Sequence, residues 1–424
     1  MPIDRRNDNR RWKSIDDLWK EAFDDNIPAL NVSEHPRGRD AFGRQRVSDP
    51  NTRLDTEFLY DKQKDFFDES VTNGTVTHNT ATRDLTLALA DANDGSFAKM
   101  SSYYVPYTPG NSQLVEITGV LDLAGIGGGQ AESFIRTSIS GSAVEHTTPQ
   151  EQWASNKDGV DWSTAHIFVM DFQSLKVGTI RWGLFQDGVF QAINQVNNDN
   201  LRDSGYWQIA SGAAYWKLYT TGGSTYMEVG YGNEANAIGF RYVITANASA
   251  TMKAICCTVK SEGGSPLREL AGLSRTADSG VTPVDVGTTL IPVLSIRPQA
   301  TYNSLPNLVL SIPKNWSVAT TNPIKLVLIH DCTLTNASWV PANGTSTMEY
   351  DVSATAVAGG HSLDSEYIAS SGSNRSGSAS GLLGKVALWD RQDDVETGIL
   401  TIAAIRTGTS NADVLASLSW EELR

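Results

Sequence analysis

The sequence contains little cysteine, and this scarcity excludes a disulfide framework. Its 424 residues include three cysteines, Cys256, Cys257 and Cys332. Neighbours such as Cys256 and Cys257 rarely bridge, because successive side chains on a strand point to opposite faces. We therefore expect reduced thiols and folding in a reducing compartment.

Long hydrophobic runs are also missing. No run of about 18 apolar residues occurs, so the sequence predicts no membrane span. Three of the first six residues are charged and no apolar segment follows them, which predicts no signal peptide. The net charge of −14 excludes a general attraction to nucleic acid or to an anionic membrane, so neither is expected as a partner.

Motifs that carry chemistry are absent as well. None of the six histidines has metal-ligand spacing with another histidine or a cysteine, and no nucleophile elbow or phosphate-binding loop occurs. On a strand, His330 and Cys332 would share one face while Asp331 points away, so we interpret this triplet as a strand end. Strand-like sequence follows the glycine cluster at 125–129, which indicates a loop and not a dinucleotide fingerprint. We expect no enzyme, no cofactor and no metal.

The residues that are abundant favour β-structure. The chain has 36 glycines and 40% apolar residues, with many small hydroxyl and amide residues. This mixture is typical of short strands joined by turns. Alternating hydrophobicity predicts strands at 113–121, 166–172, 178–185, 189–193, 215–220, 226–231, 239–246 and 251–260, and later at 287–297, 307–312, 324–330, 348–356, 384–390 and 398–406.

The predicted fold is all-β, with two antiparallel β-sandwich or jelly-roll-like domains behind an N-terminal arm. A chain of this length suggests two domains or more, and no convincing helix separates the strands. We assign residues 1–50 to an anchoring arm, 51–265 to the first sandwich, 266–283 to a linker and 284–424 to the second sandwich.

The arm is predicted to contain one short helix, at about 14–26. Ser14 is a candidate N-cap, and the apolar residues that follow have helical spacing. Pro28 ends the pattern, because it disfavours helical geometry in the residue before it. Leu18, Trp19 and Phe23 lie on the apolar stripe, which must be buried against this chain or a neighbour.

A second assembly element is predicted where the arm meets the first sandwich. Phe42 and Gly43 precede two arginines, Arg44 and Arg46, which would share one face of an extended strand. Acidic residues flank the segment on both sides. We expect the two arginines to form ion pairs within the protein or with a neighbouring subunit.

The eleven tryptophans allow two interpretations. Trp153, Trp162 and Trp207 could form a sugar-binding platform, because aromatic faces suit stacking in a concave pocket. The alternative is that they fill the core or a subunit contact. Both alternatives remain open at this point.

Four short blocks carry a resemblance to a known group. They are AFGRQRVS (41–48), YYVPYTPGNSQLVEITGVL (103–121), IFVMDFQSLKVGTIRWGL (167–184) and TVKSEGG (258–264). In this order the chain resembles virion structural proteins of tailed bacteriophages. Gln45 and Ser174 stand where the group's pattern has apolar residues, the part at 133–141 is shortened, and the chain after 265 has no match.

The resemblance implies a structural component of a virion, on the capsid surface or in the tail. Such a protein would be made in the host cytoplasm, anchored through its arm to other virion proteins, and repeated as a homo-oligomer. The alternative is a host-recognition adhesin of tail-fibre or head-fibre type that binds cell-surface glycan through a β-sandwich. A depolymerase would need paired acidic residues in a groove, which the sequence alone does not pair.

Overall fold

The computed structural model describes most of the chain after residue 50. It describes 51–423 except for 65, 91–92, 106, 108–110, 140–141, 154–159, 174, 176, 187, 198–204, 206, 208–210, 234–235, 263–273, 308, 370–374 and 379–397. Before residue 51 it describes only the backbone of Phe23–Asp24 and Ile27–Leu30.

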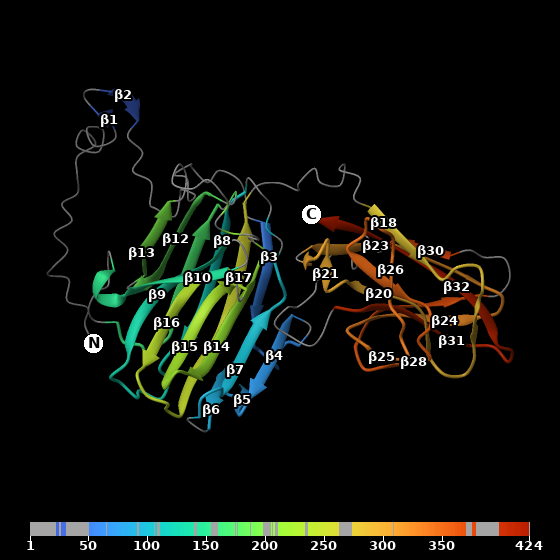
Figure 1. Cartoon of the computed structure of the whole chain (residues 1–424), viewed down its shortest axis with the longest axis horizontal. Coiled ribbons are helices and arrows are strands. Elements are labelled where there is room, and N and C mark those ends of the chain that lie inside the picture. Colours follow the sequence, from blue (N-terminus) through green and yellow to red (C-terminus); the bar gives the residue numbers. More distant parts are fainter. Residues whose placement is uncertain are drawn as a thin grey trace, which may run out of the picture.

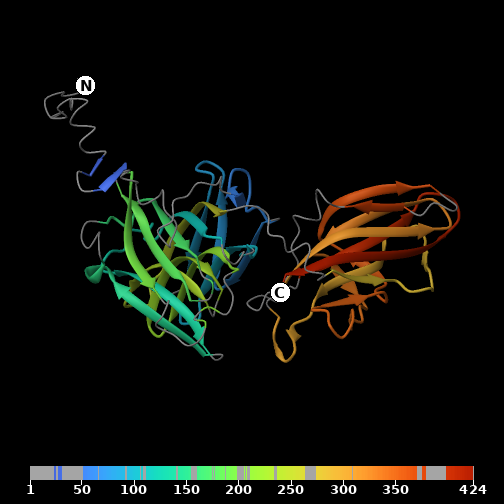
Figure 2. The same cartoon turned by 90° about the horizontal axis from the view of Figure 1, so that it is seen from above.

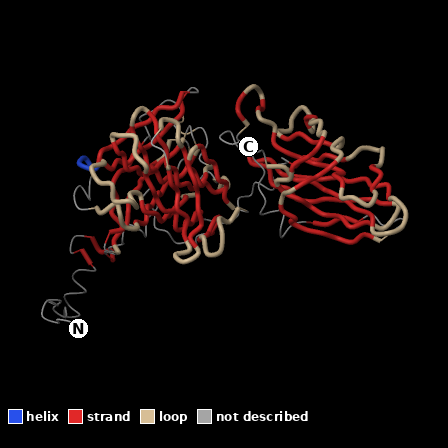
Figure 3. The backbone as a smooth tube through the Cα atoms, turned by 90° about the horizontal axis from the view of Figure 1, so that it is seen from below, coloured by secondary structure: helices blue, strands red, loops and turns tan. Residues whose placement is uncertain are grey.

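The described chain is almost entirely β-structure (Figures 1 and 3). Its one described helix is the 3₁₀ turn η3 (Gln150–Gln152). No helix among the described residues is long and apolar enough to cross a membrane. The strands pair antiparallel, and the predicted all-β fold is confirmed.

The first sandwich contains two large sheets, which form two layers when seen from above (Figure 2). The seven-stranded sheet has the order β10 (Ser142–Pro149), β9 (Gln130–Ile139), β16 (Ala237–Ile244), β15 (Ser224–Gly232), β14 (Ala213–Thr221), β7 (Phe97–Ser102) and β4 (Phe67–Thr72). The eight-stranded sheet has the order β13 (Val189–Asn197), β12 (Thr179–Gln186), β11 (His166–Phe172), β8 (Gln113–Val120), β17 (Ala250–Ser261), β6 (Asp84–Leu89) and β5 (Gly74–Asn79), with β3 (Asn51–Glu57) paired to β17.

The second sandwich has a five-stranded and a six-stranded sheet. The first contains β18 (Ser274–Asp278), β32 (Ala412–Leu423), β23 (Leu310–Thr320) and β30 (Arg375–Ser378), with β19 (Val284–Val286) also paired to β32. The second has the order β26 (Val340–Pro341), β27 (Met348–Asp351), β20 (Ile291–Pro298), β31 (Leu400–Arg406), β24 (Ile324–His330) and β29 (His361–Ile368).

Three small two-stranded sheets complete the fold. They are β1 (Phe23–Asp24) with β2 (Ile27–Leu30), β21 (Thr301–Tyr302) with β22 (Leu305–Pro306), and β25 (Thr333–Thr335) with β28 (Ala356–Ala358). Leu334 and Val357 of the last pair pack against Val327 and Ala403 of the six-stranded sheet. This sheet therefore has apolar contacts on both faces.

Alternation along the strands creates each core. On β8 the side chains of Val115 and Ile117 are fully buried, while those of the alternate residues Glu116 and Thr118 are partly exposed. One apolar cluster joins the two sheets of the first sandwich, and another joins those of the second. Burial of about 25 cal/mol per Å² of apolar surface favours this two-layer packing.

The structure corrects the predicted bounds of the helix and of the linker. Phe23–Asp24 forms strand β1, so the predicted helix does not extend to residue 26; residues 14–22 lie outside the described part. Strand β18 pairs with β32, so residues 274–278 belong to the second sandwich and not to the predicted linker. Local pattern missed both, because strands this short are defined by their pairing partners.

Candidate ligand-binding face

Five charged residues lie in register across the seven-stranded sheet. Glu132 of β9 is opposite Arg241 of β16, which is opposite Glu228 of β15. Lys217 of β14 and Lys99 of β7 continue the line. We call these five residues the charged row. Their side chains point away from the core, since Phe240 and Tyr242, which flank Arg241 on β16, pack into it.

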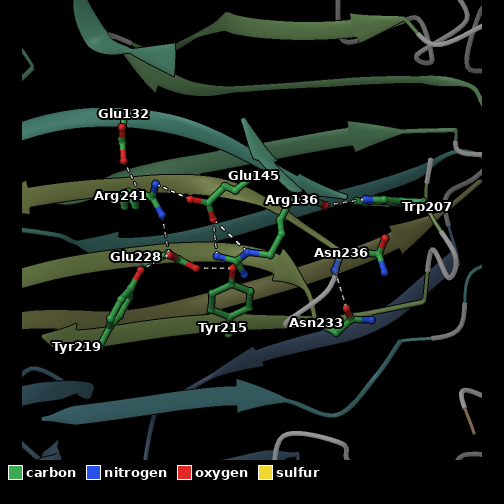
Figure 4. Close-up of polar contacts among 10 residues, drawn as sticks. All are labelled: Glu132, Arg136, Glu145, Trp207, Tyr215, Tyr219, Glu228, Asn233, Asn236 and Arg241. Atoms are coloured by element: carbon green, nitrogen blue, oxygen red, sulfur yellow. Dashed lines mark hydrogen bonds and ion pairs between the residues drawn. The ribbon is translucent and has the colours of Figure 1, made fainter. Parts of the chain in front are cut away.

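Arg241 connects three carboxylates (Figure 4). It donates to Glu132 through Nε, and its Nη2 lies 2.7 Å from Glu145 Oε1 on β10. Its Nη1 lies 3.8 Å from Glu228 Oε2. Arg136 of β9 donates to the other oxygen of Glu145, Oε2, at 2.6 Å through Nη2 and 3.1 Å through Nε. Each guanidinium therefore has a fixed position.

Glu228 is the buried centre of this network. Its side chain is almost fully buried, and two phenol groups donate to it: Tyr215 at 2.7 Å and Tyr219 at 3.3 Å. Because hydrogen bonds to a charged group are strong and an unpaired buried charge is costly, the tyrosines hold Glu228 in one orientation. Glu228 in turn positions Arg241.

Aromatic rings border the charged row. Tyr219 and Tyr226 stack with ring centroids 4.8 Å apart. The Arg241 guanidinium lies 5.5 Å from the Tyr226 ring and 5.3 Å from the Phe134 ring, and the Lys217 ammonium lies 4.9 Å from the Tyr219 ring. These cation–π contacts join the charged and aromatic groups into one surface.

Two glycines make room for the rings on the other side of the row. Phe134, Gly239, Gly230 and Tyr215 are successive partners across four strands. A Cβ on Gly230 would lie 2.6 Å from the Tyr215 hydroxyl oxygen. Glycine at this position therefore allows Tyr215 to reach Glu228.

The network holds its charges at neutral pH. Burial alone would raise the pKa of Glu145, but hydrogen bonds and charge from Arg241 and Arg136 outweigh burial and lower that pKa. Burial alone would lower the pKa of Arg241, yet the surrounding carboxylates raise it. Burial raises the pKa of the Tyr219 phenol. Glu145 is thus ionised at neutral pH and unsuited to act as a proton donor.

Exposure divides the face into two layers. Glu228, Arg241 and Tyr215 are buried. The groups above them are accessible to a ligand: Glu132, Arg136, Lys217, Tyr219 and Tyr226 are partly exposed and Glu145 is exposed. The buried layer positions the accessible layer, as preorganised binding requires.

The three predicted tryptophans are core residues in this structure. Trp153 and Trp207 are almost fully buried, and Trp162 is 8% exposed. Trp153 packs edge-on against Trp162 at 6.1 Å, and the Trp207 indole donates to the Arg136 carbonyl at 3.3 Å (Figure 4). We therefore correct the interpretation of these residues as glycan or subunit contacts. Their indole N–H groups find partners inside the domain, so the rings fill the core.

The predicted anchor residues lie outside the part of the structure in which side chains are described. They are Leu18, Trp19, Phe23, Phe42, Gly43, Arg44 and Arg46. Of these, only the backbone of Phe23 is described, in strand β1. Their role remains a prediction.

The His330 triplet is a strand end, as the sequence predicts. His330 closes β24, and Asp331 leaves the strand with a φ of 53°. The expectation that Asp331 points away is wrong, because its Oδ2 lies 3.1 Å from His330 Nδ1. Burial raises the pKa of the Cys332 thiol, whose Sγ lies 3.2 Å from Thr401 Oγ1. A nucleophilic cysteine needs the opposite shift. Within the described residues, no cluster of three or more His, Cys, Asp or Glu could hold a metal ion.

The alternation predicted three strands of this sheet, β14, β15 and β16, but not the face. Tyr215 to Tyr219 and Tyr226 to Glu228 lie on strands that the alternation predicts. The only signal of the face in the sequence is the polar positions of that alternation, such as Lys217 and Glu228. They were overlooked because polar residues at such positions are ordinary on an exposed strand face. Glu132 and Glu145 lie near these residues because β9 and β10 pair in the same sheet, and the local pattern did not predict those two strands.

Comparison with known proteins gives likenesses among solved structures only. No protein-family model matches the sequence, and no curated protein matches it. The endo-1,3-beta-glucanase of Streptomyces sioyaensis is 11% identical, with 51% of this chain and 97% of that chain covered and a TM-score of 0.29. The lectin UEA-II, in complex with galactose, is 12% identical, with 50% and 100% covered and a TM-score of 0.21.

A two-domain structure is also similar. The N-terminal CBM22-1-CBM22-2 tandem domain of Xyn10C from Paenibacillus barcinonensis is 9% identical, with 89% of this chain and 99% of that chain covered and a TM-score of 0.22. Likeness at these values does not establish a shared function. The function must be argued from the face itself.

Proposed function

We propose that the protein binds a carbohydrate on the outward face of the seven-stranded sheet, and that it acts by binding and not by catalysis. The observation that carries this proposal is the charged row with its aromatic border. Carboxylates accept and guanidinium groups donate, so fixed pairs such as Arg136 and Glu145 can satisfy neighbouring sugar hydroxyls. Partly exposed Tyr219 and Tyr226 offer apolar surface to a sugar ring.

The extent of the face favours an elongated ligand. The charged row crosses five strands, from β9 to β7. With neighbouring strands about 4.8 Å apart, its four intervals span about 19 Å. An oligosaccharide laid across the strands would contact several accessible members of the row at once.

The lowered pKa of Glu145 favours binding over hydrolysis. A glycosidase acid needs a raised pKa, whereas the pKa of Glu145 is lowered by its two arginines. The neighbouring carboxylates Glu132 and Glu228 accept hydrogen bonds from Arg241 and Tyr215, respectively. These residues therefore serve recognition in our proposal.

A glycan array with the full chain and the Tyr226→Ala variant tests the proposal. We expect wild-type protein to bind a defined set of glycans, and the variant to bind them at least about tenfold more weakly because its aromatic surface is lost. Tyr367→Ala is the matched control, since Tyr367 is 69% exposed on the second sandwich. Array binding that is absent, or equal in wild type and Tyr226→Ala, would contradict the proposal.

A second candidate function is that of a structural component of a virion. This candidate is supported by the four sequence blocks that resemble tailed-phage structural proteins. Three of the four blocks include residues of β8, β11, β12 and β17, which are adjacent strands of the eight-stranded sheet. The two functions are compatible, because an adhesin is itself displayed on a particle. Deletion of residues 1–30 should prevent incorporation into particles, and normal incorporation would contradict the anchoring role.

A further inference from the structure

A pocket of about 450 Å³ opens on the outward face of the eight-stranded sheet. It belongs to the opposite sheet from the charged row, and so is a separate site. Residues of β3, β17, β8, β11 and β12 line it, together with Gln63.

Short side chains make the floor of this pocket. Cys256 of β17 is opposite Thr118 of β8, and Thr258 is opposite Glu116. Longer side chains rise at the two ends of these rows. Ile167 pairs with Thr118 on one side, and Glu57 of β3 pairs with Cys256 on the other. The surface is hollow here because short side chains lie between longer ones on a regular sheet.

One end of the pocket is acidic. Glu116 is paired with Lys260 at 2.8 Å. Asp55 and Glu57 are exposed, and within the described part of the chain neither carboxylate has an ion-pair or hydrogen-bond partner. The pocket therefore has an excess of negative charge at its β3 end. Such a surface attracts cations.

The other end is apolar. Ile167 is 41% exposed, and Phe185 of β12 is partly exposed beside it. On the floor between the two ends, the buried hydroxyl of Thr258 has no hydrogen-bond partner among the described residues. The pocket thus combines an acidic end, an apolar end and a polar floor.

We propose that this pocket is a docking site for a basic segment of a partner protein. An arginine or lysine side chain of the partner would lie between Asp55 and Glu57, and an adjacent apolar side chain would rest on Ile167 and Phe185. Charge complementarity selects this occupant, because the carboxylates that lack partners gain one on binding. The size of the pocket suits a few side chains of one extended segment. This site is independent of the proposed carbohydrate face.

Fluorescence polarisation with the full chain tests this docking site. The probe is a fluorescein-labelled peptide of alternating arginine and valine, compared with its glutamate–valine analogue and with spermine as an unlabelled competitor. We expect the basic peptide to bind and the acidic one not to. The Asp55→Asn/Glu57→Gln variant should bind the basic peptide roughly fivefold more weakly or worse. Ile167→Ser should also weaken it.

The control variant removes two carboxylates elsewhere. Glu151→Gln/Asp364→Asn makes the same change of charge at two exposed positions, on η3 and β29, and should bind the basic peptide like wild type. Exposed carboxylates can be replaced without loss of the fold, which circular dichroism confirms. Three results would overturn the proposal: no peptide binding, equal binding by the Asp55→Asn/Glu57→Gln variant, or competition by spermine as strong as that of unlabelled peptide.

Discussion

Glu228 illustrates how one buried residue organises a surface. Its carboxylate is enclosed, yet it accepts from two tyrosines and lies 3.8 Å from Arg241. Arg241 then holds Glu132 and Glu145. A buried charge costs several kcal/mol unless it is paired, so the partners of Glu228 are as necessary as Glu228 itself.

At the same scale, the charge of Glu145 predicts a pH effect. Its pKa is lowered in the folded protein, so the stability it contributes is present above its ordinary value of about 4.3 and is lost as pH falls through the lowered folded-state value. The Glu145→Gln variant should be less stable than wild type at pH 7, by on the order of 1 kcal/mol. This difference should shrink as the pH falls from 7 to 3.

Urea unfolding at the two pH values checks this expectation. Glu151→Gln, on the exposed side of η3, is the control and should not change the pH dependence. A difference between wild type and Glu145→Gln that stays constant from pH 7 to pH 3 would exclude the proposed ionic role of Glu145.

At the scale of elements, strand prediction succeeded where alternation was strong. The predicted ranges 166–172 and 324–330 coincide with β11 and β24. Between the predicted strands 215–220 and 226–231, Gly222 and Gly223 form a turn with φ values of 59° and 75° that glycine tolerates. β32 was missed although Val414, Ala416, Leu418 and Trp420 alternate in the core with Ser417 and Ser419 between the last three, which is the period-2 pattern of a strand.

The face was less predictable than its strands. The alternation shows that Lys217 and Glu228 share a side with Tyr219 and Tyr226, but it does not show which strands become neighbours. β9 and β16 are separated by about a hundred residues in sequence, and only their pairing brings Glu132 to Arg241. Tryptophan content was misleading for a related reason, since large aromatic rings fill cores as well as binding sites.

Close packing of neighbouring strands predicts the effect of a glycine substitution. A Cβ on Gly239 of β16 would lie 2.2 Å from the Val229 carbonyl oxygen, so the backbone must shift. Gly239→Ala should therefore lower the free energy of unfolding by roughly 1–3 kcal/mol. Gly344→Ala is the control, because a Cβ there meets nothing within 4 Å. Chemical denaturation of both variants measures the effect, and equal stability would show that the sheet tolerates a side chain at Gly239.

At the scale of the whole molecule, the chain presents two different outward faces on its first sandwich. The seven-stranded sheet carries the charged row, and the eight-stranded sheet carries the pocket with one acidic and one apolar end. A protein with one face for a carbohydrate and another for a partner protein would suit attachment on a particle surface. The second sandwich has its own core and pairs its strands separately, and its role is open to experiment.

The most direct test of the central proposal is hydrogen–deuterium exchange of the full chain with and without a glycan found on the array. We predict slower exchange on β9, β14, β15 and β16, the strands that carry most of the charged row, and no such change in Tyr226→Ala. Slower exchange confined to other strands, or the same protection in Tyr226→Ala as in wild type, would contradict the proposal.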